Sequence, residues 1–170
     1  TRLADMHWRL LAPSDMAAHL DAALFRERHD LGLRPAGHLV DETLRILAGR
    51  PRAGADATPV HGAVAAGLAD RLEFGRDFVG RAAVVDAEAS PPRVRLVRAS
   101  AEAGAIEPLE PVLRQGRNVG WISSAGLAVD GRVPVLALVE GQLDGLETLA
   151  AGSRVPLRVD QPAGRSRTED

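Results

Sequence analysis

The 170-residue sequence contains no cysteine, no lysine and no tyrosine, and only 3% of its residues are aromatic. Without cysteine there is no disulfide framework, no thiolate metal site and no thiol nucleophile. So few aromatic side chains argue against a stacking platform for single-stranded nucleic acid. No apolar stretch is long enough to span a bilayer, and no basic-then-apolar leader opens the chain. These absences favour a cytoplasmic protein whose partners include neither nucleic acid nor a membrane.

What the sequence does contain is an ordinary globular composition. Hydrophobic residues make up 45% and charged residues 26%, and the formal net charge is −2. This balance gives no bulk attraction to nucleic acid or anionic lipid. The length is sufficient for one sizeable core or two small ones.

The hydrophobic pattern predicts two helices in the first half of the chain. The first begins at Ser14 or Asp15, which are capping residue types, and ends before Gly32. The second runs from Leu39 to Ala48 and stops at Gly49. Its predicted buried face consists of Leu39, Thr43, Leu44, Ile46 and Leu47.

The other segments before the double proline are less regular. Residues 6–12 alternate between two faces, which predicts a strand. Gly and Pro interrupt residues 50–62, which predicts a loop. Residues 62–72 fit either a short helix or a buried strand. Residues 81–86 form the end of a helix or a turn. The segment 89–92 (ASPP) is the best candidate for a domain boundary.

After this boundary the pattern changes to short β segments separated by turn residues. Strands are predicted at 93–98, 112–114, 119–123, 133–138 and 154–159. Their spacing favours a small antiparallel β-barrel. The fold class expected is therefore α+β: an N-terminal helix and antiparallel-sheet module at 1–88, a C-terminal barrel at 89–160 and a flexible tail at 161–170.

No constellation of residues predicts an independent catalytic or metal site. The histidines have no metal-ligand spacing, and the segment 120–124 (GWISS) lacks the G-x-S-x-G frame of a serine nucleophile. No pair of acids has an evident buried setting for acid–base catalysis. We therefore assign no catalytic residue and no metal ligand. The histidines concerned are His7, His19, His29, His38 and His61.

Three stretches in order resemble one known superfamily. They are GLRPAGHLVDETLRILAG at 32–49, GRDFVGRAAV at 75–84 and GRNVGWISSAGLAVDGRVPVLALVE at 116–140. Together they make the chain, over roughly residues 6–160, resemble the back half of the superfamily of the glycine-cleavage T-protein. Its relatives include the folate domains of sarcosine and dimethylglycine oxidising enzymes.

The resemblance implies tetrahydrofolate as the cofactor and one-carbon transfer or amine demethylation as the chemistry. In that superfamily the front half supplies most of the pterin pocket and a catalytic aspartate. We therefore expect catalysis to need a front half encoded before Thr1 or a partner chain. The implied partners are such an N-terminal-half subunit or a flavoprotein.

The chain departs from the superfamily pattern at the rim of this pocket. An Arg-Asp pair is replaced by Asp41-Glu42, a glutamate by Leu47 and an aromatic residue by Ala53. Leucine and alanine offer a pterin neither hydrogen bonds nor a π-face, so we expect this segment alone not to bind folate in the usual way. Three arginines remain as candidates for holding the glutamyl tail of the cofactor, with solvated loop charges as the alternative for the last two. They are Arg45, Arg50 and Arg52.

Three functions remain open from the sequence. The first is a part or subunit of a tetrahydrofolate-dependent one-carbon transferase or demethylating enzyme. The second is a degenerate, non-catalytic subunit that stabilises or docks a larger oxidase or demethylase complex. The third is a free-standing module that binds another small acid. The altered positions 41, 47 and 53 favour the second function. The function we expect is membership of a folate-type one-carbon assembly, without independent catalysis by this chain.

Overall fold

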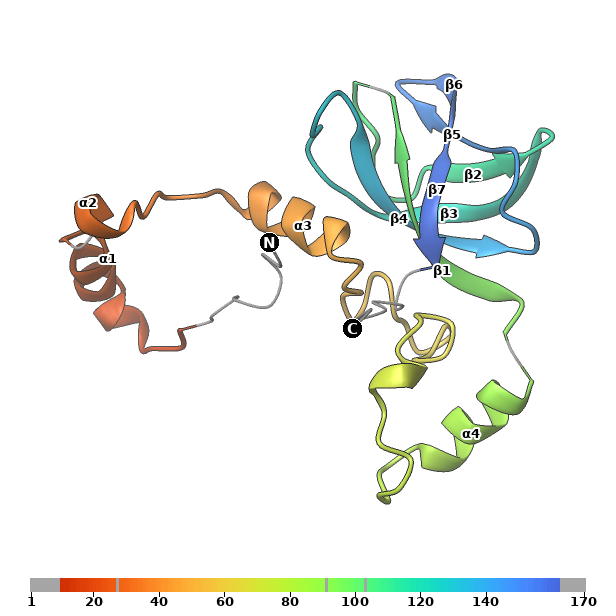
Figure 1. Ribbon diagram of the computed structural model, residues 1–170, viewed down its shortest axis with the longest axis horizontal. Helices are drawn as coiled ribbons and strands as arrows, with labels where there is room; N and C mark the ends of the chain where they lie inside the picture. The colour runs from red at the N-terminus through yellow and green to blue at the C-terminus, as the bar shows by residue number, and fades with distance from the viewer. Residues whose placement is uncertain (1–9, 27, 91, 103, 163–170) are drawn as a thin grey trace, which may run out of the picture.

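The computed structural model describes residues 10–26, 28–90, 92–102 and 104–162. The helices lie in the first half and the strands in the second (Figure 1). The helices are α1 (Ala17–Arg26), α2 (Arg28–Leu31), α3 (His38–Leu47) and α4 (Arg81–Ala89), with 3₁₀ turns η2 (Ser14–Met16) and η3 (Ala69–Arg71). The strands are β1 (Val94–Ala101), β2 (Pro111–Arg114), β3 (Arg117–Ala125), β4 (Val133–Glu140), β5 (Leu146–Ala150), β6 (Ser153–Pro156) and β7 (Arg158–Pro162).

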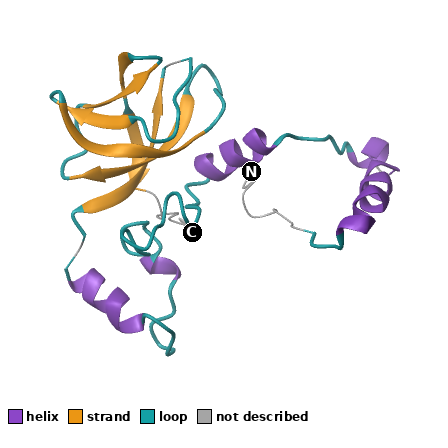
Figure 2. Ribbon diagram, turned by 180° about the vertical axis from the view of Figure 1, so that it is seen from behind, coloured by secondary structure: helices purple, strands orange, loops and turns teal. Residues whose placement is uncertain are grey.

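All the strands belong to one curled antiparallel sheet in the order β6-β5-β2-β3-β4-β1-β7. The two edge strands, β6 and β7, are separated in the chain only by Leu157. A single residue joins opposite edges only if the sheet curls until those edges meet, and Figure 2 shows this curled shape. The α+β class is thus confirmed. The predicted barrel is a curled sheet, because no ladder joins β6 to β7 within residues 104–162.

The sheet buries apolar side chains on both faces, since successive residues of a strand point in opposite directions. The larger core lies inside the curl and takes Val97 and Ala99 from β1 and the odd-numbered residues of β4. On the outer face, Leu96, Leu136 and Leu138 pack against Ile46 of α3. Burial on both faces explains why β4 reads as an almost unbroken apolar run.

Helix α3 has the predicted position but a different buried face. Thr43 and Ile46 are buried as expected, but they are joined by Glu42, which is only 8% exposed. Leu39, Leu44 and Leu47 are wrong predictions, with 57%, 42% and 41% of their surface exposed. The helical period identifies apolar stripes, but it does not say which stripe faces the sheet. Here a polar contact made by Glu42 determines the orientation.

Among the described residues before α4, no strand is present apart from an isolated bridge between Ala53 and Ala57. The predicted strand at 6–12 lies mostly outside the described residues, and Leu10, Leu11 and Ala12 are not in a strand. The undecided segment 62–72 is a series of turns ending in η3. The Ala65 carbonyl in it accepts a hydrogen bond from the Leu96 amide at 2.7 Å, which ties this segment to β1.

The segments flanking the sheet also differ from their predictions in part. Helix α4 runs to Ala89, beyond the expected 86, and β1 begins at Val94, so the predicted boundary at 89–92 begins at the last residue of the helix and ends before the strand. The division into two domains stays a prediction. Strand β7 extends to Pro162, into the predicted tail. Residues 163–170 and His7 lie outside the residues that the structure describes.

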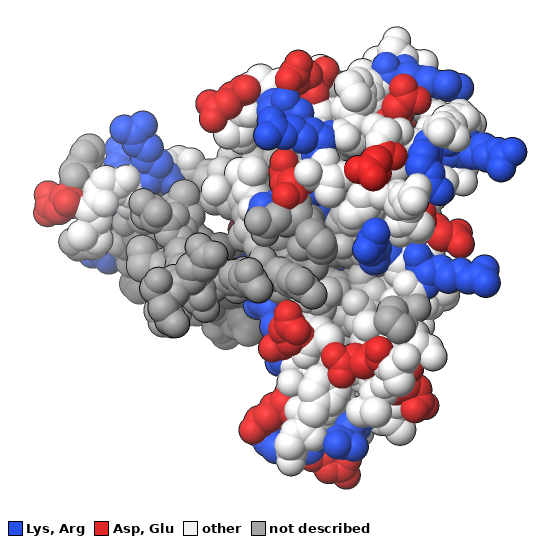
Figure 3. Space-filling model, turned by 45° about the vertical axis from the view of Figure 1, so that its right-hand side comes forward, with Lys and Arg blue, Asp and Glu red and all other residues white. Residues whose placement is uncertain are grey.

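The apolar character of the helices and the distribution of surface charge bear on possible partners. Within the described residues, no helix has both the length and the apolar character needed to traverse a bilayer. On the face shown in Figure 3, acidic and basic side chains are interspersed. This mixed pattern agrees with the net charge of −2.

Candidate functional site

A buried carboxylate, Asp56, connects the loop after α3 to strand β3. Its side chain is fully buried. One carboxylate oxygen accepts hydrogen bonds from the hydroxyls of Ser123 at 2.5 Å and Ser124 at 2.8 Å. The other accepts from Nη1 of Arg45 at 2.7 Å and from the backbone amide of Arg52 at 2.8 Å. Both oxygens are therefore satisfied inside the protein, as burial of a charge requires.

Arg45 is the cation at the centre of this arrangement, and all five of its N–H donors are used. Nε and Nη2 form a fork on the carboxylate of Glu42, at 3.3 and 2.8 Å. Nη1 donates to Asp56 and to the Arg50 carbonyl, the latter at 2.6 Å, and Nη2 also donates to Ser124 at 2.8 Å. Burial lowers the pKa of Arg45, but the hydrogen bond to Glu42 and the charge of Asp56 outweigh it, so the pKa is raised above the ordinary value of an arginine. The guanidinium is thus permanently charged and fixed in position.

Glu42 is shared by two arginines. Besides the fork from Arg45, it makes an ion pair with Arg52, with Nη1 and Oε1 3.0 Å apart. The hydrogen bond from Arg45 lowers the pKa of Glu42 below its ordinary value of 4.5, with desolvation acting in the opposite direction. We call the five residues Glu42, Arg45, Asp56, Ser123 and Ser124 the Arg45 network.

A bulge in β3 brings both serines to the same carboxylate. The pairing of β3 with β4 shifts register between Ile122 and Ser124. In a regular strand, Ser123 and Ser124 would point to opposite faces, but the extra residue at the bulge re-aims one of them. Asp56, Ser123 and Ser124 were not predicted as a cluster. The sequence signals were a pair of hydroxyls inside an apolar strand and, for Asp56, the G-D frame at 54–56 that it shares with the superfamily.

The three arginines proposed from the sequence occupy different environments. Arg45 is held inside the network, and Arg50 contributes its backbone carbonyl to it. The Arg52 side chain is 46% exposed and pairs with Oε1 of Glu42. Contact of these residues with a glutamyl tail stays a prediction. Arg52 is the one whose exposure suits such a contact best.

The first turn of α3 carries a group of potential metal ligands that were not predicted from the sequence. Ligand atoms of His38, Asp41 and Glu42 lie within 4.8 Å of one another. However, both oxygens of Glu42 already face guanidinium groups of Arg45 and Arg52. A divalent cation would have to displace them against their positive charge, so this arrangement disfavours a metal.

The lowered pKa of Glu42 predicts a pH dependence of stability. A carboxylate whose folded pKa lies below its unfolded value stabilises the fold fully above the unfolded pKa, and this contribution is lost as the pH falls through the folded pKa. We expect the free energy of unfolding to fall more steeply below pH 4.5 in the parent than in Glu42→Gln. Urea unfolding between pH 3 and 7 measures this. Parallel curves for the two proteins would contradict the assignment.

Comparison with known proteins identifies the fold. No protein-family model matches the sequence, and no curated protein matches it. Among solved structures, the chain is similar to the glycine cleavage system aminomethyltransferase T from Bartonella henselae, with a TM-score of 0.72 and 19% sequence identity. The similarity covers 90% of this chain and 46% of that protein. The chain has a T-protein-like fold.

This finding confirms the resemblance inferred from the three sequence stretches. At 19% identity it establishes the T-protein-like fold and leaves activity open. The chain also spans less than half the length of the aminomethyltransferase that it matches. The Arg45 network therefore lies in a region that corresponds to less than half of the matched protein.

Proposed function

We propose that this chain is part of a tetrahydrofolate-dependent one-carbon transfer or demethylation assembly. The observation that carries the proposal is the T-protein-like fold, which extends over 90% of the chain. A solved structure with this fold is named as an aminomethyltransferase. The Arg45 network supports the proposal by fixing α3 rigidly on the sheet, as a pocket wall requires.

The residues of the Arg45 network, with Arg52 beside them, fit only one end of a folate. A pterin ring needs a carboxylate with oxygens available for its amide and amine edge. Both oxygens of Glu42 and both of Asp56 are already bonded within the protein. The exposed guanidinium of Arg52 suits a different part of the cofactor, the anionic glutamyl tail. We therefore assign tail binding to this chain and derive no catalytic step from it.

A partner surface is the second part of the proposal. Helix α3 leaves Val40, Leu44 and Leu47 exposed on the side away from its buried face. These residues lie at positions i, i+4 and i+7 and thus form one stripe. Helix α1 has no buried residue at all, and Figure 1 shows it apart from the sheet. A short helix in water is marginal without packing, so both elements favour a covering partner.

We propose that this partner is the complementary part of a T-protein-like fold. The matched aminomethyltransferase is more than twice as long as the matched region, so the remainder of that fold is available to cover the stripe. A flavoprotein subunit is the alternative occupant. Co-purification of the full chain from its source, followed by mass spectrometry, distinguishes the two. A monomer without either partner would contradict this part of the proposal.

One observation favours the non-catalytic alternative. Every donor of Arg45 is consumed inside the protein, and the exposed positions around it include the apolar Leu44 and Leu47. Such a surface suits docking better than cofactor chemistry. In this reading, the chain stabilises a larger oxidase or demethylase complex.

Calorimetric titration with tetrahydrofolate bearing one or several glutamates tests tail binding. We expect tighter binding of the longer tail, and a loss of about tenfold in affinity for it in Arg52→Gln, the scale of one charge-assisted hydrogen bond. Arg71→Gln is the matched control, because Arg71 is an exposed arginine of η3 that, unlike Arg52, forms no ion pair with Glu42. Equal affinities for both tails would contradict tail binding and favour the docking subunit.

A further inference from the structure

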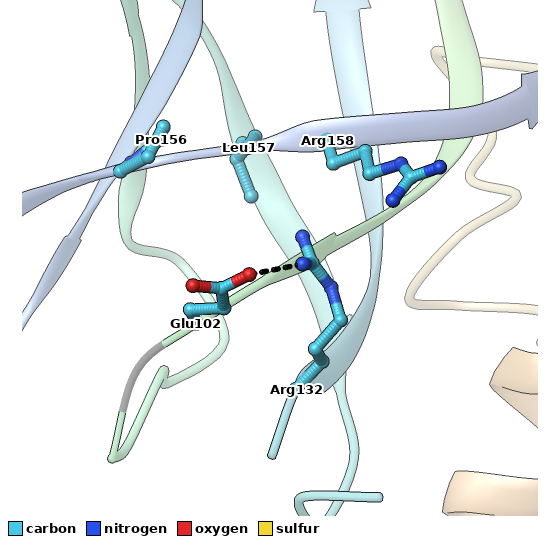
Figure 4. A pocket seen from close by; sticks show the side chains of 5 residues that line it. All are labelled: Glu102, Arg132, Pro156, Leu157 and Arg158. Atoms are coloured by element: carbon cyan, nitrogen blue, oxygen red, sulfur yellow. Dashed lines mark hydrogen bonds and ion pairs between the residues drawn. The ribbon is translucent and has the colours of Figure 1, made fainter. Parts of the chain in front are cut away.

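A small cavity lies where the two edges of the sheet meet. It has a volume of about 170 Å³ and is shared by the end of β1, the residue before β4 and the junction of β6 with β7. Figure 4 shows the lining side chains, which are Glu102, Arg132, Pro156, Leu157 and Arg158. None of them belongs to the Arg45 network. The volume is below the range of pockets for drug-sized ligands and suits a ligand of a few atoms.

One of the two cations in this cavity is held in a defined orientation. Nε of Arg132 donates to the hydroxyl of Ser100 at 3.2 Å, and Nη1 is ion-paired with Glu102. The side chain of Arg132 is only 29% exposed. Within the described part of the chain, its Nη2 makes no hydrogen bond. A fixed guanidinium with donors to spare is prepared for an incoming acceptor.

The second cation, Arg158, enters the same space from β7. Its guanidinium makes no hydrogen bond or ion pair with any residue that the structure describes. In Figure 4 its side chain extends to the same side of β7 as Arg132. The cavity thus contains two positive groups and one negative group. Two like charges beside each other are unfavourable unless an anion lies between them.

The cavity also has an apolar wall that strengthens such an interaction. Leu157 is buried and contributes to the inner core of the sheet, and Pro156 lies beside it. Apolar atoms on one side of a charged group lower the local dielectric, so an ion pair there is stronger than on an open surface. The position is also rigid, because the Leu157 amide donates to the Leu146 carbonyl at 2.8 Å.

We infer that this cavity is a binding site for a small oxyanion, a carboxylate or a phosphate group, held between Arg132 and Arg158. Glu102 acts as an internal competitor, because its carboxylate already occupies Nη1 of Arg132. The Glu102 side chain is 73% exposed, so it moves into solvent at little cost when a ligand arrives. The site requires nothing from the folate proposal.

Calorimetry at constant ionic strength, with inorganic phosphate and acetate as separate probes, tests this site on the full chain. We expect saturable one-to-one binding of at least one probe and a loss of about tenfold in affinity in Arg158→Gln. Glu102→Gln is expected to bind the same probe several-fold more tightly, since it removes the competing charge. The two probes also distinguish a phosphate site from a carboxylate site.

Arg117→Gln is the matched control, since Arg117 is an exposed arginine in the β2–β3 hairpin and carries the same charge. It should bind the probe as the parent does. Equal weakening in Arg117→Gln and Arg158→Gln would show only non-specific attraction and overturn the proposal. So would weaker binding in Glu102→Gln, because Glu102 would then support the site instead of competing for it. Chemical-shift changes confined to residues 100, 132 and 157–158 should accompany specific binding.

Discussion

Replacing Arg45 with leucine is expected to lower the free energy of unfolding by about 3–5 kcal/mol, the range observed when one partner of a buried ion pair is removed. Asp56 is fully buried and would lose its cation, and Glu42 would lose both bonds of its fork. The backbone carbonyl of Arg50 and the hydroxyl of Ser124 would lose a donor as well. Urea unfolding at pH 7 measures the loss.

A control and a second variant show whether the loss of stability comes from the Arg45 network or from removing any positive charge. Arg71→Leu removes an exposed arginine and should change stability by less than about 0.5 kcal/mol. Arg45→Lys keeps the charge but not the planar fork, so it should recover only part of the lost stability. If Arg45→Leu unfolds at the same urea concentration as the parent, the network is not a structural element of the fold.

Gly120→Ala is expected to be the most damaging small substitution in the sheet, with a cost of about 3 kcal/mol, the upper end of the usual range for overpacking. A Cβ at position 120 would lie 2.0 Å from the carbonyl oxygen of Leu138 and 3.0 Å from the Cα of Val139. Both atoms belong to the backbone of β4, so no side-chain rotation relieves the clash. β3 and β4 would have to separate at the centre of the sheet.

Gly75→Ala provides the comparison, because a Cβ there would have no atom within 4 Å. Its stability should match that of the parent or exceed it slightly through the reduced entropy of the unfolded chain. Thermal unfolding followed by circular dichroism compares the two variants directly. A Gly120→Ala protein as stable as Gly75→Ala would mean that β3 and β4 are not in the register described.

The local pattern predicted most elements of the sheet and the helix beside it. The alternation at 93–98 and the apolar run at 133–138 became β1 and β4, and the helix predicted at 39–48 is α3 at His38–Leu47. Two features of the sheet were not predicted. No strand was predicted where β5, Leu146–Ala150, lies, and the strand expected at 154–159 is divided at Leu157 between two edges. The division arises from the curling of the sheet, which places β6 and β7 at opposite edges on either side of one residue.

The geometry of the candidate site could not be predicted from local sequence patterns either. Arg45 was singled out as a cation for a ligand, and the structure shows its donors used on the protein itself. Asp56 is 11 residues from Arg45 and 67 from Ser123, so no local pattern links them. The bulge that aims Ser123 and Ser124 together depends on pairing with β4. The sequence offered two hydroxyls and an acid without their geometry.

The α+β class, the place of α3, the central strands and the superfamily resemblance follow from local sequence, because each depends on periodicity or on short stretches of neighbouring residues. Which stripe of α3 is buried, where Arg45 points and how the sheet edges meet are settled by the folded chain. Those features depend on contacts between residues far apart in the chain, and burial of the charged Glu42 and Asp56 is favourable only when all their partners are assembled together.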